Sequence, residues 1–228
     1  MRETTGLVQT KRLFGLDGVD IKGTLFDLDG VLVDTAKYHY LAWRRLAKEL
    51  GFDFTEADNE RLKGVSRVRS LEILLETGGV TMADDEKEPA ATRKNTWYVE
   101  YLSTLDETAL LPGTKDYLSR LRENGIRIAL GSASKNAPLI LERLNIAAMF
   151  DAVIDGNSVS KAKPDPEVFL NGAKAIGLPP EHCVVFEDAL AGIEAAKAGG
   201  MRVIAVGTPE LLPGADRYVA SLADMLVG

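Results

Sequence analysis

The chain has 228 residues, of which 46% are hydrophobic and 27% charged, and its formal net charge is −7 at pH 7. This length is enough for one well-packed core or for a core with a small inserted domain. The negative charge argues against a general role on nucleic acid or on a membrane surface, and no apolar run reaches the roughly 20 residues that a bilayer span requires.

Cysteine and histidine are scarce, which limits the metal chemistry that the chain can support. Cys183 is the single cysteine, and its apolar neighbours predict a core position in a protein of the reducing cytoplasm. The two histidines, His39 and His182, lie far apart in the sequence. A structural zinc site is therefore not expected, and a hard, oxygen-ligated ion such as Mg²⁺ fits the composition better.

Residues 1–20 are the least informative part of the sequence. We expect no signal peptide here, because the segment lacks a continuous apolar stretch. The pair Asp17-Gly18 is typical of a hairpin turn. An added edge strand, a flexible arm and a cloning remnant all stay open as explanations.

From residue 21 onward, short apolar runs alternate with helical patterns. Apolar runs of the kind found in buried parallel strands span residues 21–26, 126–130, 183–186 and 203–206, with a weaker one at 152–154. Helical patterns cover residues 115–122, 135–144, 166–176 and 189–198, and most of them end at a glycine. The alternation predicts an α/β fold with a doubly wound, Rossmann-like parallel sheet.

One segment interrupts this alternation. Between residues 35 and 110 no convincing strand occurs, and helical patterns cover residues 35–50, 55–62, 68–76 and about 84–105. The tripeptide Leu111-Pro112-Gly113 is typical of a hinge that returns the chain. We therefore predict two domains: an α/β core of residues 1–34 and 111–228, and an inserted helical cap of residues 35–110.

Polar side chains follow the predicted strands at the point where each strand ends. Ligands of open α/β sheets bind at the carboxyl ends of the strands, so these side chains are expected to meet at one edge. They are Asp27 and Asp29 after the run at 21–26, Ser132, Ala133, Ser134, Lys135 and Asn136 after the run at 126–130, Lys163 in a later loop, and Glu187 and Asp188 after the run at 183–186.

This collection makes chemical sense as a phosphoryl-transfer site. Four acids at one edge require a nearby cation, which Mg²⁺ and Lys163 would supply. One aspartate of the first pair can attack phosphorus, and the other can move a proton. Each motif alone also has a structural explanation: a turn at Asp27 to Gly30, an N-cap at Ser134, loop punctuation at Lys163-Pro164, and a helix cap at Glu187-Asp188.

The joint pattern resembles the haloacid dehalogenase superfamily. An apolar run is followed by D-x-D-G-V, a serine after a strand, a Lys-Pro pair and a Glu-Asp pair after another strand, over about residues 21–207. The resemblance implies Asp27 as the nucleophile and Asp29 as the general acid/base. It implies that Ser132 and Lys163 hold the transferring phosphoryl group. It also implies Mg²⁺ bound by Asp27, the Asp29 carbonyl and Asp188, with Glu187 in support.

Within this superfamily the chain is similar to a branch of sugar-phosphate mutases. The matching words are DTAKYHYLAW, LKGVSR, RKN, GSASKN and KPDPE. This similarity implies the interconversion of β-D-glucose 1-phosphate and glucose 6-phosphate through an aspartyl-phosphate enzyme and β-glucose 1,6-bisphosphate. A phosphatase of small sugar phosphates is the alternative. We expect small-molecule sugar phosphates as the only partners, with no nucleic acid or membrane, and a monomer.

A mutase requires a second site that grips the phosphate that is not being transferred. The residues implied for it are Lys63, Gly64, Arg67 and Lys94 from the cap, with Ser134, Lys135 and Asn136 from the core. A solvated loop with an N-cap at Ser66 is the structural alternative for residues 62–67.

Thr35 and His39 lie four residues apart on one predicted helical face, and the similarity implies that they restrain Asp29. A plain N-cap at Thr35 and a half-buried linker residue at His39 are the structural alternative. Val68 and Arg69 depart from the acids expected after Arg67, which points to altered sugar contacts or a broader substrate range.

Overall fold

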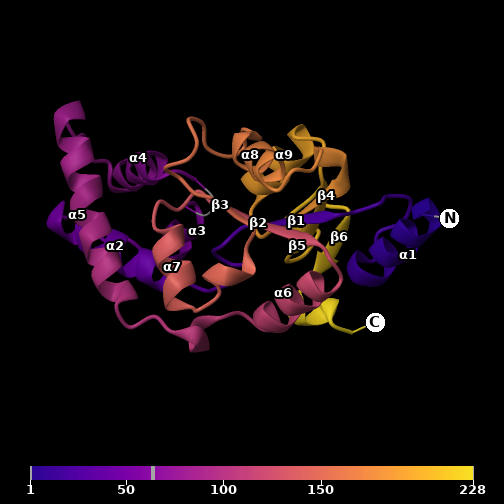
Figure 1. The fold of residues 1–228 in the computed structure, drawn as a ribbon. Helices are drawn as coiled ribbons and strands as arrows, with labels where there is room; N and C mark the ends of the chain where they lie inside the picture. The colour runs from indigo at the N-terminus through magenta and orange to yellow at the C-terminus, as the bar shows by residue number, and fades with distance from the viewer. Residues whose placement is uncertain (1, 63–64, 228) are drawn as a thin grey trace.

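A computed structural model describes residues 2–62 and 65–227 and contains a sheet of six parallel strands in the order β3-β2-β1-β4-β5-β6 (Figure 1). The strands are β1 Gly23–Phe26, β2 Arg127–Gly131, β3 Ala152–Ile154, β4 Cys183–Glu187, β5 Arg202–Val206 and β6 Arg217–Val219. The predicted doubly wound α/β architecture is therefore confirmed. β1 pairs with β2 on one side and β4 on the other, so the strand order switches beside β1.

Helices cover both faces of the sheet (Figure 1). Their bounds are α1 Arg2–Phe14, α2 Ala36–Glu49, α3 Glu56–Glu60, α4 Arg67–Gly78, α5 Asp84–Leu102, α6 Thr114–Glu123, α7 Ala137–Arg143, α8 Glu167–Ala175 and α9 Leu190–Ala198. Short 3₁₀ turns are η1 Glu107–Ala109, η2 Ala147–Met149, η3 Pro180–His182 and η4 Leu222–Met225.

Two separate buried clusters explain why the predicted strands are apolar along their whole length. In β1, Phe26 packs with the cluster that contains Tyr117 of α6, whereas Leu25 packs with the cluster that contains Phe169 of α8. Successive strand residues point to opposite faces. Because both faces are covered, every residue of the two central strands, β1 and β4, is buried. Cys183 belongs to the α8 cluster and is fully buried, as its neighbours predicted.

The N-terminal segment is a helix, which none of the explanations considered for residues 1–20 included. α1 is tied to the core at its C-terminal end, where Leu13 and Phe14 are buried. Tyr117 donates a hydrogen bond to the Leu13 carbonyl at 3.1 Å, and Arg217 donates one to the Phe14 carbonyl at 2.7 Å. These partners lie more than 100 residues away in sequence, so no local pattern could announce the docking.

Helices α2 to α5 form the inserted segment beyond the carboxyl ends of the strands (Figure 1). The two stretches of chain that connect the core to the inserted segment run side by side. Val33 and Leu110 form an antiparallel bridge, and the Leu111 amide donates to the Leu32 carbonyl at 3.0 Å. Trp43 of α2 and Tyr98 of α5 are buried in this segment. The division of the chain into core and cap at residues 34/35 and 110/111 stays a prediction. The pairing of these two connecting stretches is the observation that supports it.

No helix among the described residues is both long and apolar enough to cross a membrane.

Candidate active site

A cavity of about 1110 Å³ lies where the carboxyl ends of the strands face helices α2 to α5. Every predicted site residue that the structure describes lines this cavity, except Thr35 and Glu187. Lys63 and Gly64 lie outside the described residues. The parallel topology thus brings together the side chains that follow separate strands, as the sequence predicted.

Lys163 forms the charged centre of the site. Its Nζ donates to Asp27 Oδ1 at 2.6 Å and to Glu187 Oε1 at 2.7 Å, and its side chain is only 1% exposed. Burial alone would lower the pKa of Lys163, but the Asp27 and Glu187 carboxylates together raise it above its usual value. The ammonium group therefore stays charged and holds the two acids of adjacent strands β1 and β4.

Asp29 has a carboxyl group in an environment that favours its protonated form. Burial, followed by the nearby Asp27 and Asp34 carboxylates, raises the pKa of Asp29 to about 8. The Thr35 hydroxyl donates a hydrogen bond to Asp29 Oδ1 and accepts one from the Tyr98 hydroxyl at 3.3 Å. Thr35 is the N-cap of α2 but makes no side-chain cap hydrogen bond, so its hydroxyl serves Asp29 instead.

His39 and Lys94 connect this acid to the buried interior of the cap helices. Lys94 Nζ and His39 Nδ1 lie 2.9 Å apart, and the His39 ring stacks on Tyr98 with centroids 4.0 Å apart. Burial, then the Lys94 and Arg67 charges, lowers the pKa of His39, while burial, then Arg67, lowers the pKa of Lys94. A neutral imidazole can therefore accept from the Lys94 amine without a cost in like-charge repulsion.

The loop after β2 presents hydroxyl groups and amides to the cavity. Ser132 is buried, and its Oγ accepts from the Ser134 amide at 3.1 Å, which leaves its hydroxyl proton for another partner. Asn136, not Ser134, is the N-cap residue of α7, and the Ser134 hydroxyl accepts from the Asn136 amide at 3.2 Å just ahead of the helix. Asn136 Nδ2 donates to Asn95 Oδ1 of α5 at 2.8 Å and so links the core loop directly to the cap.

The acids available for a cation lie where β1 and β4 end. Gly30, in a left-handed conformation with φ +80°, leaves room for Asp188: a Cβ on Gly30 would lie 1.9 Å from Asp188 Oδ2. Both Glu187 oxygens are engaged, with Oε2 accepting from the Ala189 amide at 2.8 Å. Within the described part of the chain, no group of three or more His, Cys, Asp or Glu side chains has metal-ligand geometry. Asp27, Asp188 and a backbone carbonyl form a donor set of oxygens only, as Mg²⁺ prefers, and Mg²⁺ commonly completes its shell with water and substrate oxygens.

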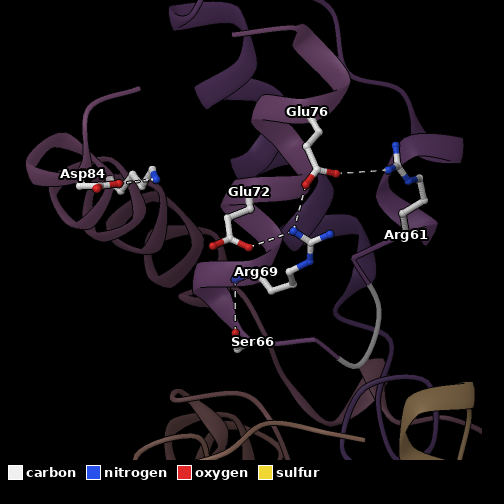
Figure 2. Close-up of polar contacts among 7 residues, drawn as sticks. Arg61, Ser66, Arg69, Glu72, Glu76 and Asp84 are labelled. Carbon is white, nitrogen blue, oxygen red and sulfur yellow. Dashed lines mark hydrogen bonds and ion pairs between the residues drawn. The ribbon is translucent and has the colours of Figure 1, made fainter. Parts of the chain in front are cut away.

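The start of α4 supplies the cap side of the cavity. Ser66 is its N-cap and accepts from the Arg69 amide at 3.3 Å, while Arg67 follows as the first helical residue and lines the cavity. Arg69, which departs from the expected acid, does not line the cavity. Its guanidinium pairs with Glu72 at 2.9 Å and Glu76 at 3.0 Å on the outer side of α4 (Figure 2).

Two residues that contact the predicted site were not assigned to it from the sequence, although Asn95 is the last residue of the matching word RKN. Tyr98 donates to Thr35, and Asn95 bonds to Asn136 across the cavity. Tyr98 lies four residues after Lys94 on α5, hence on the same helical face, and that spacing is the signal that could have found it. Trp43 and Trp97 are both buried.

The fold and this edge of acids, lysine and serine define a class of phosphoryl-transfer and related hydrolytic enzymes. The model of the haloacid dehalogenase-like hydrolase family matches residues 21–200. The chain therefore belongs to that family, as its motifs indicated.

Within the family, the chain is 42% identical over 207 residues to the beta-phosphoglucomutase of Bacillus subtilis, covering 90% of this chain and 92% of that protein. It is also 32% identical to a phosphorylated carbohydrates phosphatase of Thermotoga maritima, covering 81% of this chain and 84% of that protein. A crystal structure of beta-phosphoglucomutase from Clostridium difficile superposes with a TM-score of 0.86 at 41% identity, over 90% of this chain and 92% of that one.

Proposed function

We propose that the protein is a mutase that interconverts β-D-glucose 1-phosphate and glucose 6-phosphate through β-glucose 1,6-bisphosphate. The observation that carries the proposal is the Thr35 hydroxyl on the Asp29 carboxyl, which ties the acid/base to the cap helices. The similarity to two beta-phosphoglucomutases over about nine-tenths of the chain supports it. The enzyme would act on small sugar phosphates as a cytoplasmic monomer; the single, buried thiol of Cys183 fits a reducing compartment.

Asp27 is the proposed nucleophile. Its carboxylate attacks the phosphorus of the sugar phosphate to form an aspartyl-phosphate, and the sugar hydroxyl leaves. Lys163, already 2.6 Å from Asp27 Oδ1, lies where it can neutralise charge on the transferring phosphoryl oxygens. The Ser132 hydroxyl, with the amide of Ala133 beside it, offers donors to the same group. In the reverse half-reaction the second sugar hydroxyl takes the phosphoryl group from Asp27.

Asp29 is the proposed general acid/base. A pKa of about 8 keeps its carboxyl protonated at neutral pH, which suits proton donation to the departing sugar oxygen. After that step the carboxylate can accept a proton from the next sugar hydroxyl. Thr35 fixes one oxygen of Asp29, and Tyr98, His39 and Lys94 make this restraint part of the cap. Water that enters an open site then meets an acid/base that is not aligned to activate it.

The donor set fits Mg²⁺ bound by the Asp27 carboxylate, the Asp29 carbonyl and Asp188. When bound, the ion would offset the negative charge of the acids and of the substrate phosphate. Glu187 has both oxygens engaged by protein donors, so its proposed part is to hold Lys163 and the start of the loop that carries Asp188.

The non-transferring phosphate is proposed to bind between the start of α4 and the loop after β2. Arg67 and Ser66 line this part of the cavity from the cap, and Ser134, Lys135 and Asn136 line it from the core. Lys63, Gly64 and Lys94 complete the proposed set. The hydrogen bond from Asn136 to Asn95 joins the two sides, so gripping the phosphate and closing the cap would occur together.

A phosphatase of small sugar phosphates is the second candidate, favoured by the similarity to the phosphorylated carbohydrates phosphatase. The two functions differ in the acceptor of the phosphoryl group, which is a sugar hydroxyl in a mutase and water in a phosphatase. The test is to incubate the enzyme with Mg²⁺, β-glucose 1-phosphate and a trace of the 1,6-bisphosphate. We expect glucose 6-phosphate to accumulate faster than inorganic phosphate, and no turnover of the α-anomer. Rapid phosphate release without glucose 6-phosphate would refute the mutase.

A further inference from the structure

The short helix α3 places a polar side chain in the interior of the cap. Asn59 is the buried residue of this helix and is only 6% exposed. Its backbone is engaged at both ends: the Asn59 amide donates to the Thr55 carbonyl at 3.1 Å, and the Asn59 carbonyl accepts from the Leu62 amide at 3.0 Å. Asparagine side chains mostly lie at protein surfaces, so a buried one calls for a physical reason.

The side-chain oxygen of Asn59 is buried and has no hydrogen-bond partner among the described residues. In the same part of the chain, Arg44 Nε is the other buried side-chain atom without a partner, but Arg44 does not line the cavity, whereas Asn59 does. A buried acceptor without a donor is costly, and native structures nearly always pair such a group. The donor for Asn59 is therefore expected to come from the cavity.

The chemistry of this oxygen selects a hydroxyl group rather than a phosphate. An amide oxygen only accepts hydrogen bonds, and the oxygens of an ionised phosphate do the same, whereas a hydroxyl group can donate. The other asparagine of the cap that lines the cavity, Asn95, already uses its side-chain oxygen to accept from Asn136 at 2.8 Å. Asn59 thus adds a neutral acceptor to a wall of the cavity whose Arg67 suits phosphate.

We propose that Asn59 is a specificity-determining residue whose side-chain oxygen accepts a hydrogen bond from one ring hydroxyl of the sugar phosphate. This inference deepens the proposed function and rests on it, because that function places a sugar ring between the two phosphate sites. The last torsion of an asparagine side chain is soft and broadly distributed. A partial turn of the amide therefore brings Oδ1 to the cavity when a hydroxyl is there to donate.

The burial of Oδ1 makes this contact stronger than one formed at an exposed amide. Folding has already removed water from the oxygen, so binding of the hydroxyl satisfies it without that desolvation cost. A substrate without the hydroxyl leaves the oxygen unpaired. Its kcat/KM should therefore be about 5- to 100-fold lower than that of the complete sugar phosphate.

The test compares the parent protein and Asn59→Leu on β-glucose 1-phosphate and its 2-deoxy, 3-deoxy and 4-deoxy analogues. The consumption of each compound is followed with Mg²⁺ and a trace of the 1,6-bisphosphate. In the parent protein we expect one analogue to have a kcat/KM about 5- to 100-fold below that of β-glucose 1-phosphate. In Asn59→Leu the value for β-glucose 1-phosphate should fall by a similar factor, and the same analogue should no longer differ from it.

Thermal denaturation without substrate separates a binding role from a structural one. Leucine keeps nearly the shape of asparagine and removes the unpaired group, so we expect the Tm of Asn59→Leu to equal that of the parent protein or to exceed it by up to about 8 °C. The matched control is Asn124→Leu, outside the cavity lining, where the amide donates to the Arg120 carbonyl at 2.7 Å and accepts from Arg12. This control should lower Tm and leave kcat/KM unchanged for all four compounds.

Equal ratios of kcat/KM among the four compounds in the parent protein and Asn59→Leu would overturn the assignment. A Tm of Asn59→Leu as low as that of the control would also overturn it, because the amide would then have a partner within the protein. The measured consumption of sugar phosphate applies to a mutase and to a phosphatase alike. Release of inorganic phosphate in place of glucose 6-phosphate would therefore refute the proposed function alone, and the same ratios would still decide the contact of Asn59.

Discussion

Replacing Thr35 by valine removes one hydroxyl and keeps the shape of the side chain, so it isolates the contact on which the proposed function depends. Thr35 is fully buried, and its hydroxyl serves Asp29 and Tyr98 together. In the variant the buried Tyr98 hydroxyl loses its acceptor and Asp29 loses a donor. Unsatisfied buried polar groups cost about 1–3 kcal/mol each. Since Asp29 borders the cavity and can turn to water, we expect a total loss of about 2–4 kcal/mol in the free energy of unfolding.

For a protein of this size, that loss corresponds to a decrease in Tm of about 4–16 °C by thermal denaturation. The functional effect should be a shift in product ratio. Once Asp29 has donated its proton to the departing sugar oxygen, it is a carboxylate, and a hydrogen bond to a charged group contributes about 1.5–3 kcal/mol. Release of this carboxylate should raise phosphate release relative to glucose 6-phosphate by about 10- to 100-fold. Quenched-flow product analysis with β-glucose 1-phosphate measures this ratio.

Two controls separate the roles of the hydroxyl. Thr35→Ser keeps the donor and should preserve the product ratio. Tyr98→Phe removes only the hydrogen bond to Thr35 and should lower Tm by less than Thr35→Val does. An unchanged product ratio in Thr35→Val would refute the idea that this hydroxyl restrains Asp29, whatever the change in Tm.

Two further predictions concern the charged centre. Lys163→Met leaves Asp27 and Glu187 buried without their shared cation. We expect the free energy of unfolding, measured with urea at pH 7, to fall by about 3–5 kcal/mol and phosphoryl transfer to be lost. Parent-like stability would show that the ion pairs contribute little. Without metal, in the presence of a chelator, the raised pKa lets folded Asp29 retain its proton up to about pH 8, whereas the unfolded group loses it near its ordinary pKa of 3.8. The stabilising contribution of Asp29 is therefore full below about pH 4 and is lost as the pH rises toward 8, by up to about 1.4 kcal/mol per pH unit. We expect the difference in unfolding free energy between the parent protein and Asp29→Asn to change with pH by this slope.

Much of the core could be predicted because its strands are buried on both faces and carry continuous apolar runs. The first strand, predicted at residues 21–26, is β1 Gly23–Phe26, and the weak run at 152–154 is β3. Strand β6 was missed, since its three residues at the edge of the sheet are too short and too exposed to form such a run. Helix α1 was missed because the Leu13 and Phe14 carbonyls at its C-terminal end accept hydrogen bonds from residues far away in the sequence.

The sequence by itself determined which chemical groups meet. Asp27, Ser132, Lys163 and Asp188 follow or lie between apolar strands, and parallel strands deliver their carboxyl ends to one edge. The resemblance carried by those motifs supplied the family, which the match over residues 21–200 confirmed.

Only the tertiary structure decided how these groups are oriented. The Thr35 hydroxyl turns from its own helix end to Asp29, Glu187 gives both oxygens to protein donors, and Arg69 turns away from the cavity to Glu76. For each of these side chains, the sequence pattern also allowed a partner nearby in the chain. The physical reason for the outcome is that burial makes an unpaired polar group costly, so the packing of distant segments selects the partner.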